Sequence, residues 1–245
     1  MENEYLEAEP QDAQPSPEAS PEPSPLRLFG LWLRETSVVL VLALALSVLL
    51  RTFIFQAFYV PSVSMMDTLN VNDRIVASKL SYRFGEVHRG DIIVFHDPSD
   101  WLSELPVQEG WQGKLSSFFT WIGVLPSNSG DDLVKRVIGL PGDHVKCCSP
   151  DGQIIVNGKA LDEQAYAVGS SADVTFDIVV PAGRVFVMGD NREHSADSRY
   201  HLDDHFGTVP MGNIVGQVVA LVWPIERFDL PGNPMESLGI PAPGQ

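Results

Sequence analysis

The sequence predicts a mainly β protein that is preceded by one N-terminal transmembrane helix. Short runs of β-branched residues recur after residue 60 and are separated by Gly, Pro, Asn and Asp, which is the pattern of many short strands. One nearly continuous apolar segment precedes these runs, and no convincing soluble helix longer than a few turns follows it. A chain of 245 residues is long enough for a membrane anchor and one sizeable globular unit.

An acidic, proline-rich tail begins the chain. Residues 1–25 contain seven acidic residues, six prolines and no Lys or Arg. Such a stretch cannot bury enough apolar surface to offset the entropy of ordering, so we expect a disordered cytoplasmic tail with a basic flank over residues 1–34. The formal net charge of the whole chain is -16. This charge argues against a nucleic-acid partner, which would need clustered Lys and Arg.

The apolar segment is predicted to span a lipid bilayer between residues 35 and 60. Its core, Val38–Leu50, is shorter than the roughly 20 residues that cross the hydrocarbon, so the prediction adds the aromatic residues beyond Arg51, whose guanidinium reaches the headgroups. The alternative is a cleaved signal peptide, but the segment lacks a basic leading region and a clean small-residue cleavage site. Arg27 and Arg34 flank its N-terminal side, which predicts a cytoplasmic N-terminus and an extracytoplasmic domain in the cell envelope.

Residues 61–230 are predicted to form the β domain, with an insertion around residues 99–132. An Asn-Gly dipeptide suits a type I′ turn and predicts a hairpin over Gly152–Leu161. The insertion carries aromatic residues amid Gly, Ser and Pro, and is either an interfacial loop at headgroup depth or the core of a subdomain. Residues 231–245 are expected to form a loose tail. The other strand candidates are Asp91–Phe95, Leu133–Leu140, His144–Cys147, Arg184–Met188 and Ile214–Trp223.

Two cysteines are adjacent, at Cys147 and Cys148. Neighbouring residues on a strand point to opposite faces, so we expect free thiols. The alternative is a disulfide between the neighbours in an oxidising outer compartment. Two cysteines are too few for a metal site, and neither alternative makes them catalytic.

Three sequence blocks contain residues that suit nucleophilic catalysis. They are Ser62–Leu69 (SVSMMDTL), Leu133–Asp143 (LVKRVIGLPGD) and Gly189–Arg199 (GDNREHSADSR). In content and order these blocks resemble the type I signal peptidases of bacteria, also called leader peptidases. The resemblance implies the signal-peptidase-type β fold and a membrane-bound Ser-Lys endopeptidase. Such an enzyme removes signal peptides from exported preproteins, and cleaves after small residues at the first and third positions before the scissile bond.

The resemblance assigns Ser64 as the nucleophile and Lys135 as the general base. A serine hydroxyl needs a group that takes its proton, and a lysine can do so once it is neutral. Apolar neighbours of Lys135 favour the neutral amine because they desolvate the ammonium. The resemblance also implies an oxyanion hole made by the Ser62 hydroxyl and the Ser64 backbone N–H. In an extended segment the two serines would point to the same side.

The third block supplies supporting residues by the same match. It implies that Ser195 hydrogen-bonds Lys135 and that Asp197 pairs with Arg199. Arg136 and Asp190 are also assigned to the support of the site.

The chain departs from the family pattern at two places. Asp67 stands where a proline is common, which loosens the turn after the nucleophile because a fixed φ is lost. Glu193 and His194 replace the usual Asp-Asn. His194 is the alternative base, since eukaryotic relatives use a histidine there, but the block around Lys135 favours the lysine type.

Two rival functions stand beside this interpretation. One is a cytosolic LexA-like Ser-Lys autopeptidase, against which the anchor and the lack of a DNA-binding domain argue. The other is a non-catalytic envelope anchor protein.

A metal site could rest only on His201 and His205, which lack the pattern of a zinc peptidase, so we expect no metal and no cofactor. The expected partners are signal peptides and the lipid bilayer, and the oligomeric state is left open.

Overall fold

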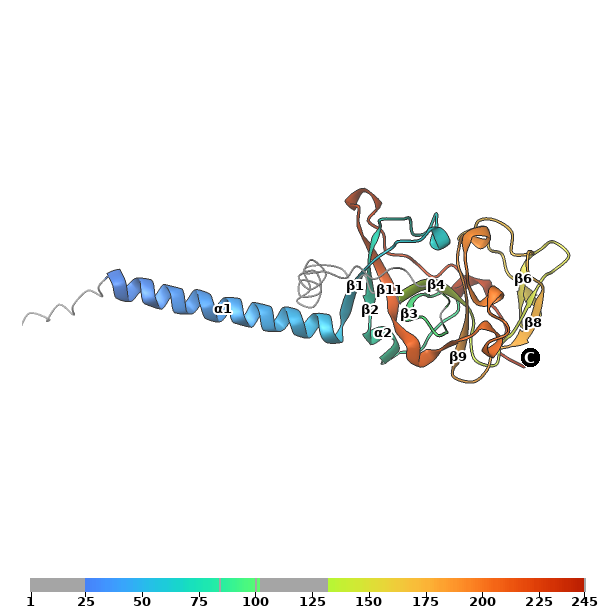
Figure 1. Ribbon diagram of the computed structural model, residues 1–245, viewed down its shortest axis with the longest axis horizontal. Helices are drawn as coiled ribbons and strands as arrows, with labels where there is room; N and C mark the ends of the chain where they lie inside the picture. Colours follow the sequence, from blue (N-terminus) through green and yellow to red (C-terminus); the bar gives the residue numbers. More distant parts are fainter. Residues whose placement is uncertain (1–24, 84, 100, 102–131, 245) are drawn as a thin grey trace, which may run out of the picture. The chain divides into compact units, whose positions relative to one another are not determined.

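The computed structural model describes residues 25–83, 85–99, 101 and 132–244. The acidic tail and most of the predicted insertion therefore lie outside the described residues. The chain divides into two units, residues 1–44 and 45–245, and each is considered by itself. Within the second unit the described strands form two antiparallel sheets (Figure 1), which confirms the mainly β class.

One long apolar helix, α1, covers Pro25–Phe53. Its residues 25–50 are long and apolar enough to cross a membrane, judged by length and composition. The predicted bounds of 35–60 are wrong at both ends, since the helix begins ten residues earlier and ends at Phe53. An α-helix of 29 residues is about 43 Å long, which exceeds the thickness of the hydrocarbon, so the length of a span does not need the aromatic stretch that the prediction added. The side chain of Arg51 lies outside the described part of the chain.

The aromatic stretch after α1 is a strand and not part of the helix. Strand β1, Phe55–Tyr59, pairs antiparallel with β2, Arg74–Ser78. Its side chains alternate between exposure and burial, with Phe55 47% exposed and Phe58 2% exposed. Aromatic residues suit such a half-buried pleated surface. The sequence did not show this alternation, because nearly all residues of the segment are apolar.

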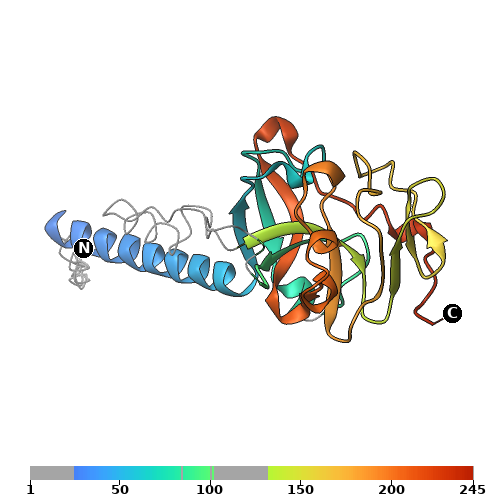
Figure 2. The ribbon, with the colours of Figure 1, turned by 45° about the vertical axis from the view of Figure 1, so that its right-hand side comes forward.

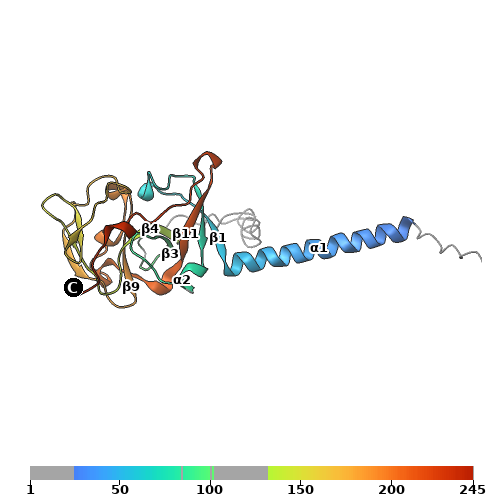
Figure 3. The ribbon, with the colours of Figure 1, turned by 180° about the vertical axis from the view of Figure 1, so that it is seen from behind.

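The larger sheet has seven strands in the order β1-β2-β11-β3-β4-β9-β10. Strand β4 lies near its centre and pairs with β3 on one side and β9 on the other. Figures 1 and 3 show these strands from opposite sides. The remaining bounds are β3 Ile92–His96, β4 Asp132–Gly139, β9 Arg184–Met188, β10 Val209–Pro210 and β11 Ile214–Trp223.

The smaller sheet has four strands in the order β7-β6-β5-β8 and lies towards the C-terminus in Figure 2. The predicted hairpin is confirmed, because β6 and β7 pair across a two-residue turn. Asn157 and Gly158 have φ values of 49° and 81° there, as a type I′ turn requires. The bounds are β5 His144–Cys147, β6 Ile154–Val156, β7 Lys159–Ala160 and β8 Phe176–Val179.

Helices are short in the described part of the second unit after α1. One α-helical turn, α2, covers Leu80–Arg83, and the others are three-residue 3₁₀ turns. These turns are η1 Val63–Met65, η2 Arg192–His194, η3 Ser198–Tyr200, η4 His205–Gly207, η5 Met211–Asn213, η6 Ile225–Arg227 and η7 Glu236–Leu238.

The C-terminal segment packs against the second unit, contrary to the loose tail that was expected. Met235 is 3% exposed and belongs to the apolar cluster beneath the smaller sheet. Asn233 donates a hydrogen bond to the Arg89 carbonyl at 2.7 Å, and Asn157 donates one to the Pro241 carbonyl at 2.8 Å. Burial and hydrogen bonding, not composition, decide whether such an end is ordered.

Cys147 and Cys148 are joined by a disulfide, so the expected free thiols are wrong and the alternative is correct. The expectation relied on the alternation of side chains along a strand. That rule does not reach Cys148, because β5 ends at Cys147.

Trp101 is the described aromatic residue of the predicted insertion. It is 7% exposed and packs edge-on against Phe95 and face-on against His201. At this position the ring is buried, and it belongs to the apolar cluster of β3, β4 and β9 instead of a separate subdomain. The other aromatic residues of the insertion lie outside the described residues.

Candidate active site

Ser64 lies in the single turn η1, which Ser62 caps. The Ser62 hydroxyl accepts a hydrogen bond from the Ser64 backbone N–H at 3.2 Å, which is a usual way to begin a helical turn. Ser64 is 6% exposed. The expectation of an extended segment is therefore wrong beyond Ser62, because the chain turns there and uses the Ser64 N–H for the cap.

Residues of the third block hold the turn that carries Ser64. The Asn191 backbone N–H donates to the Ser64 carbonyl at 3.1 Å, and the Asn191 side-chain amide donates to the Val63 carbonyl at 3.1 Å. Gly189 lies so close that a Cβ there would sit 2.4 Å from the Ser64 carbonyl oxygen. Only glycine permits this approach, so the Gly-Asp-Asn sequence fixes the position of Ser64.

Lys135 extends from β4 to Ser64. Its Nζ atom lies 2.5 Å from the Ser64 Oγ atom, although the two residues are 71 positions apart in the chain. Lys135 is 2% exposed. Burial lowers the pKa of its ammonium from 10.5 to about 8, against the opposing charges of Asp197 and Asp190. A neutral amine beside a serine hydroxyl can accept its proton.

Arg136, the next residue on β4, forms a closed ion pair with Asp190. Two parallel hydrogen bonds of 2.8 and 2.6 Å join the guanidinium to the carboxylate, and a third joins it to the Gly90 carbonyl at 2.7 Å. Asp190 also accepts a hydrogen bond from the Thr68 hydroxyl at 2.6 Å. This pair links β4 to the loop after η1.

Asp197 and Arg199 form a second buried ion pair, with both side chains fully buried. Two hydrogen bonds of 2.9 and 3.0 Å join them. Asp197 also accepts a hydrogen bond from the Gly189 backbone N–H at 3.0 Å. The pair thereby supports the segment that packs against Ser64.

Ser195 does not make the hydrogen bond to Lys135 that the resemblance implies. Its Oγ atom is buried and has no hydrogen-bond partner among the described residues. A Cβ on Gly189 would lie 2.2 Å from this oxygen, so the hydroxyl faces the glycine backbone. The Lys135 amine is directed to Ser64 instead.

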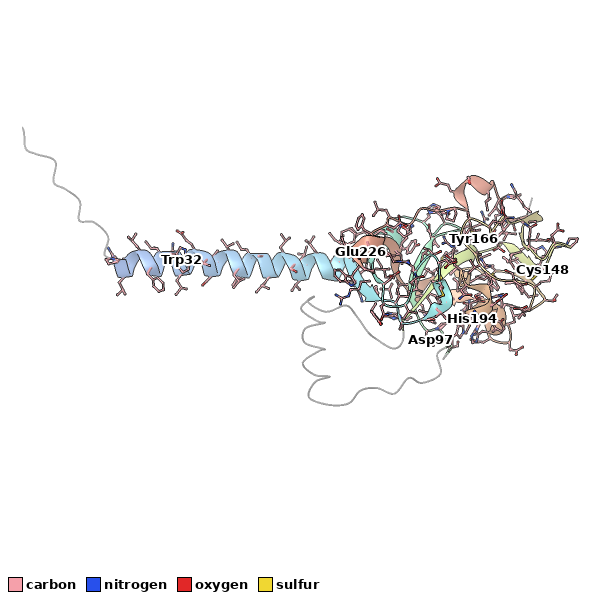
Figure 4. The ribbon with its side chains drawn as sticks, turned by 90° about the horizontal axis from the view of Figure 1, so that it is seen from above. Trp32, Asp97, Cys148, Tyr166, His194 and Glu226 are labelled. Carbon is pink, nitrogen blue, oxygen red and sulfur yellow. A yellow bond between two sulfur atoms is a disulfide. The ribbon has the colours of Figure 1, made fainter. Side chains whose placement is uncertain are left out.

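His194, the alternative base, lies in η2 and is exposed. Its Nδ1 atom is 3.3 Å from the Asn191 side-chain oxygen, and Figure 4 labels the residue. The Ser64 hydroxyl is bonded by Lys135. The geometry thus favours the lysine over the histidine.

The two histidines of the weak metal motif have separate surroundings. The His201 ring stacks on Trp101, with ring centroids 4.5 Å apart, whereas the His205 Nδ1 atom contacts the Asp204 carboxylate at 2.6 Å. Within the residues that the structure describes, no group of three His, Cys, Asp or Glu could hold a metal ion.

Sequence reasoning missed three residues of the surrounding network: Thr68, Glu163 and Tyr166. Thr68 stands in the first block, and its hydroxyl was a visible candidate. Glu163 forms an ion pair with Arg192 at 2.9 Å, and the ring of Tyr166 lies next to the guanidinium groups of Arg192 and Arg136. No local pattern marks these two residues, because their partners come from distant parts of the chain.

Comparison with known proteins identifies the family. A model of the family "Signal peptidase, peptidase S26" matches residues 33–223. Signal peptidase I of Mycobacterium tuberculosis (strain ATCC 25618 / H37Rv) is 39% identical over 234 residues, which cover 84% of this chain and 77% of that protein. Signal peptidase I of Leptolyngbya laminosa is 35% identical over 223 residues, which cover 91% and 92%. The chain therefore belongs to the signal peptidase family, peptidase S26.

Proposed function

We propose that this chain is a membrane-anchored signal peptidase I in which Ser64 is the nucleophile and Lys135 is the general base. The observation that carries the proposal is the distance of 2.5 Å between the Lys135 Nζ and Ser64 Oγ atoms, in a setting that lowers the pKa of the lysine to about 8. A buried, depressed lysine beside a serine suits acyl transfer.

The chemistry follows from this pair. Neutral Lys135 takes the hydroxyl proton as Ser64 Oγ attacks the carbonyl carbon of the scissile peptide bond. The resulting ammonium then gives the proton to the leaving amine when the C–N bond breaks, and an ester to Ser64 remains. Lys135 next takes a proton from water, which attacks the ester, and returns it to Ser64 Oγ as the carboxylate product forms.

The oxyanion of this reaction requires donors near Ser64. The Ser64 N–H and the Ser62 hydroxyl are the donors we assign, and they now bond each other at 3.2 Å. A substrate carbonyl oxygen that accepts from both would replace this internal bond. Once they point at the substrate oxygen, such donors stabilise the developing negative charge.

The substrate we assign is a signal peptide bound as an extended strand. The first half of β4, ahead of Arg136, pairs with β3, while the pairing with β9 begins at Arg136. Among the described strands, none covers this edge before Lys135 on the β9 side. An added strand here would bring its carbonyl groups past Ser64, and small side chains before the scissile bond would fit next to the buried turn η1.

Helix α1 supports the anchor because its length and composition suit a single bilayer span. We assign the N-terminus to the cytoplasm, since Arg27 and Arg34 lie in the N-terminal part of α1, ahead of its uninterrupted apolar core Val38–Leu50, and positive flanks stay inside. Protease added to intact spheroplasts should digest the catalytic domain and spare an epitope fused to Met1. Digestion of the epitope alone would contradict this orientation.

The full chain in detergent, with a peptide derived from a signal sequence and its cleavage site, tests the function. Ser64→Ala should lose cleavage by about 10³-fold or more with an unchanged circular dichroism spectrum. Ser237→Ala, an exposed serine in η7, is the matched control and should cleave as the wild type does. Retained cleavage by Ser64→Ala would refute the assigned nucleophile, and a wild-type chain that cleaves no such peptide would favour a non-catalytic anchor.

A further inference from the structure

Tyr166 lies next to two buried arginines. The Arg136 guanidinium carbon lies 4.7 Å from the centre of its ring, and that of Arg192 lies 5.8 Å from it. Tyr166 is 7% exposed, and the two arginines are 2% and 1% exposed. Figure 4 labels Tyr166 within the globular part of the chain. Aromatic faces attract cations, most strongly where water is excluded.

The two arginines have different hydrogen-bonding environments. Arg136 binds Asp190 through its edge. Arg192 pairs with Glu163 at 2.9 Å, its Nε has no partner among the described residues, and the Tyr166 hydroxyl donates to Glu163 at 3.2 Å. The ring, the carboxylate of Glu163 and Arg192 thus form one group, and the Arg136 guanidinium lies over the ring of this group.

A guanidinium forms hydrogen bonds only around its edge, so its face must be covered by another means. Without the Tyr166 ring beside the guanidinium, water would reach the Arg136–Asp190 pair and compete for the carboxylate. The consequence extends to Lys135, the neighbour of Arg136 on β4. The charges of Asp190 and Asp197 oppose the depression of the Lys135 pKa, and that of Arg199 assists it.

We propose that Tyr166 is a positioning residue for the catalytic lysine: its ring seals the Arg136–Asp190 ion pair and keeps the Asp190 charge neutralised beside Lys135. This inference rests on the proposed role of Lys135 as base. Tyr166 lies outside the three sequence blocks. Arg192, whose guanidinium carbon lies 5.8 Å from the centre of the ring, helps to hold the ring in place.

Direct titration of Lys135 tests the inference without relying on activity. The chain has five lysines, so lysine labelled with ¹³C at Cε gives few NMR signals, and Lys135→Met identifies the one from Lys135. In the full chain in detergent micelles, Tyr166→Leu should raise the Lys135 pKa by roughly half a unit to one unit. Tyr166→Phe retains the ring and should leave this pKa at its wild-type value.

Phe176→Leu is the matched control for a loss of core packing. Phe176 is 5% exposed and belongs to the same apolar cluster as Tyr166, but its ring packs on Phe186 instead of a guanidinium. It should lower the melting temperature much as Tyr166→Leu does, with no change in the Lys135 pKa. At pH 7.5, Tyr166→Leu should lower kcat up to about tenfold, with KM unchanged, because less Lys135 is neutral.

An unchanged Lys135 pKa in Tyr166→Leu would overturn the inference, and so would an equal rise in Phe176→Leu or Tyr166→Phe. Failure of the proposed function has a separate signature, which is cleavage that survives in Lys135→Met. The titration would still decide whether Tyr166 governs the lysine in that case.

Discussion

Lys135 and Arg136 are neighbours on one strand and are equally buried, yet their side chains have different hydrogen-bond partners. Arg136 donates hydrogen bonds to the Asp190 carboxylate from two of its nitrogen atoms and to the Gly90 carbonyl from the third. Lys135 has a serine hydroxyl. A buried cation must be paired or must lose its proton, and only the lysine can lose one at an accessible pH. Under the proposed mechanism, one strand thereby provides both a structural cation and a base.

The largest expected effect comes from removing the difference between the two neighbours. Lys135→Arg places a second guanidinium at the site, which stays charged at every accessible pH. Cleavage should fall by about 10³-fold or more across the whole pH range, as measured by peptide turnover in detergent. Lys146→Arg on β5, in the smaller sheet, is the control and should retain activity. Activity of Lys135→Arg that recovers at alkaline pH would contradict the comparison.

Loss of the carboxylate partner should turn Arg136 into an unpaired buried cation. Asp190→Ala is expected to lower the free energy of unfolding by about 3–5 kcal/mol, measured by urea unfolding of the full chain in micelles. Asp177→Ala removes a carboxylate that is 67% exposed. This variant should change the free energy of unfolding by less than about 0.5 kcal/mol. Equal losses of unfolding free energy in the two variants would mean that leaving Arg136 without its carboxylate partner costs no more than removing an exposed carboxylate.

Removal of the Lys135 amine should raise the free energy of unfolding, whereas removal of the Asp190 carboxylate should lower it. Its folded pKa of about 8 lies below the ordinary value of 10.5, so the unfolded chain binds more protons between these values and stability rises with pH there. Lys135→Met should therefore be more stable than the wild type by about 3 kcal/mol at pH 7. This advantage should shrink as the pH rises from 8 to 10.5. An advantage that does not change with pH would show that the ammonium carries no burial penalty.

The smallest effect is expected at Ser195. Its Oγ atom has no hydrogen-bond partner among the described residues, so Ser195→Ala should change the free energy of unfolding by less than about 1 kcal/mol. Ser198→Ala is the comparison, because the Ser198 hydroxyl accepts a hydrogen bond from the Val187 N–H at 2.9 Å and its loss leaves that donor unpaired. A larger loss in Ser195→Ala than in Ser198→Ala would show that Ser195 has a partner after all.

Local chemistry made part of this structure predictable. The Asn157–Gly158 turn follows from two residues that tolerate positive φ, and the resemblance of the blocks indicated Ser64 and Lys135 although the residues are far apart in the chain. Strand β1 was missed because Phe55–Tyr59 continues an apolar run, and its alternation becomes meaningful only when β2 pairs with it. The C-terminal segment is ordered because Met235 is buried in the apolar cluster. The amino-acid composition of the segment does not predict this burial.

The support of the site was harder to predict than its reactive groups. Tyr166 and Glu163 depend on arginines from β4 and η2, so their role arises only in the folded chain. The cap between Ser62 and Ser64 was missed for a related reason, since an extended segment and a 3₁₀ turn are both compatible with Pro-Ser-Val-Ser. The direction of the Ser195 hydroxyl depends on the close approach of Gly189.

The pH dependence of kcat/KM for the wild-type chain tests the central claim most directly, namely that burial makes Lys135 a base. The substrate should be a peptide without groups that titrate between pH 6 and 10 in this assay. Because the neutral amine is the active form, kcat/KM should rise with pH and reach half its maximum near the Lys135 pKa of about 8. A profile that is highest on the acidic side of neutral and falls towards pH 8 would contradict the account.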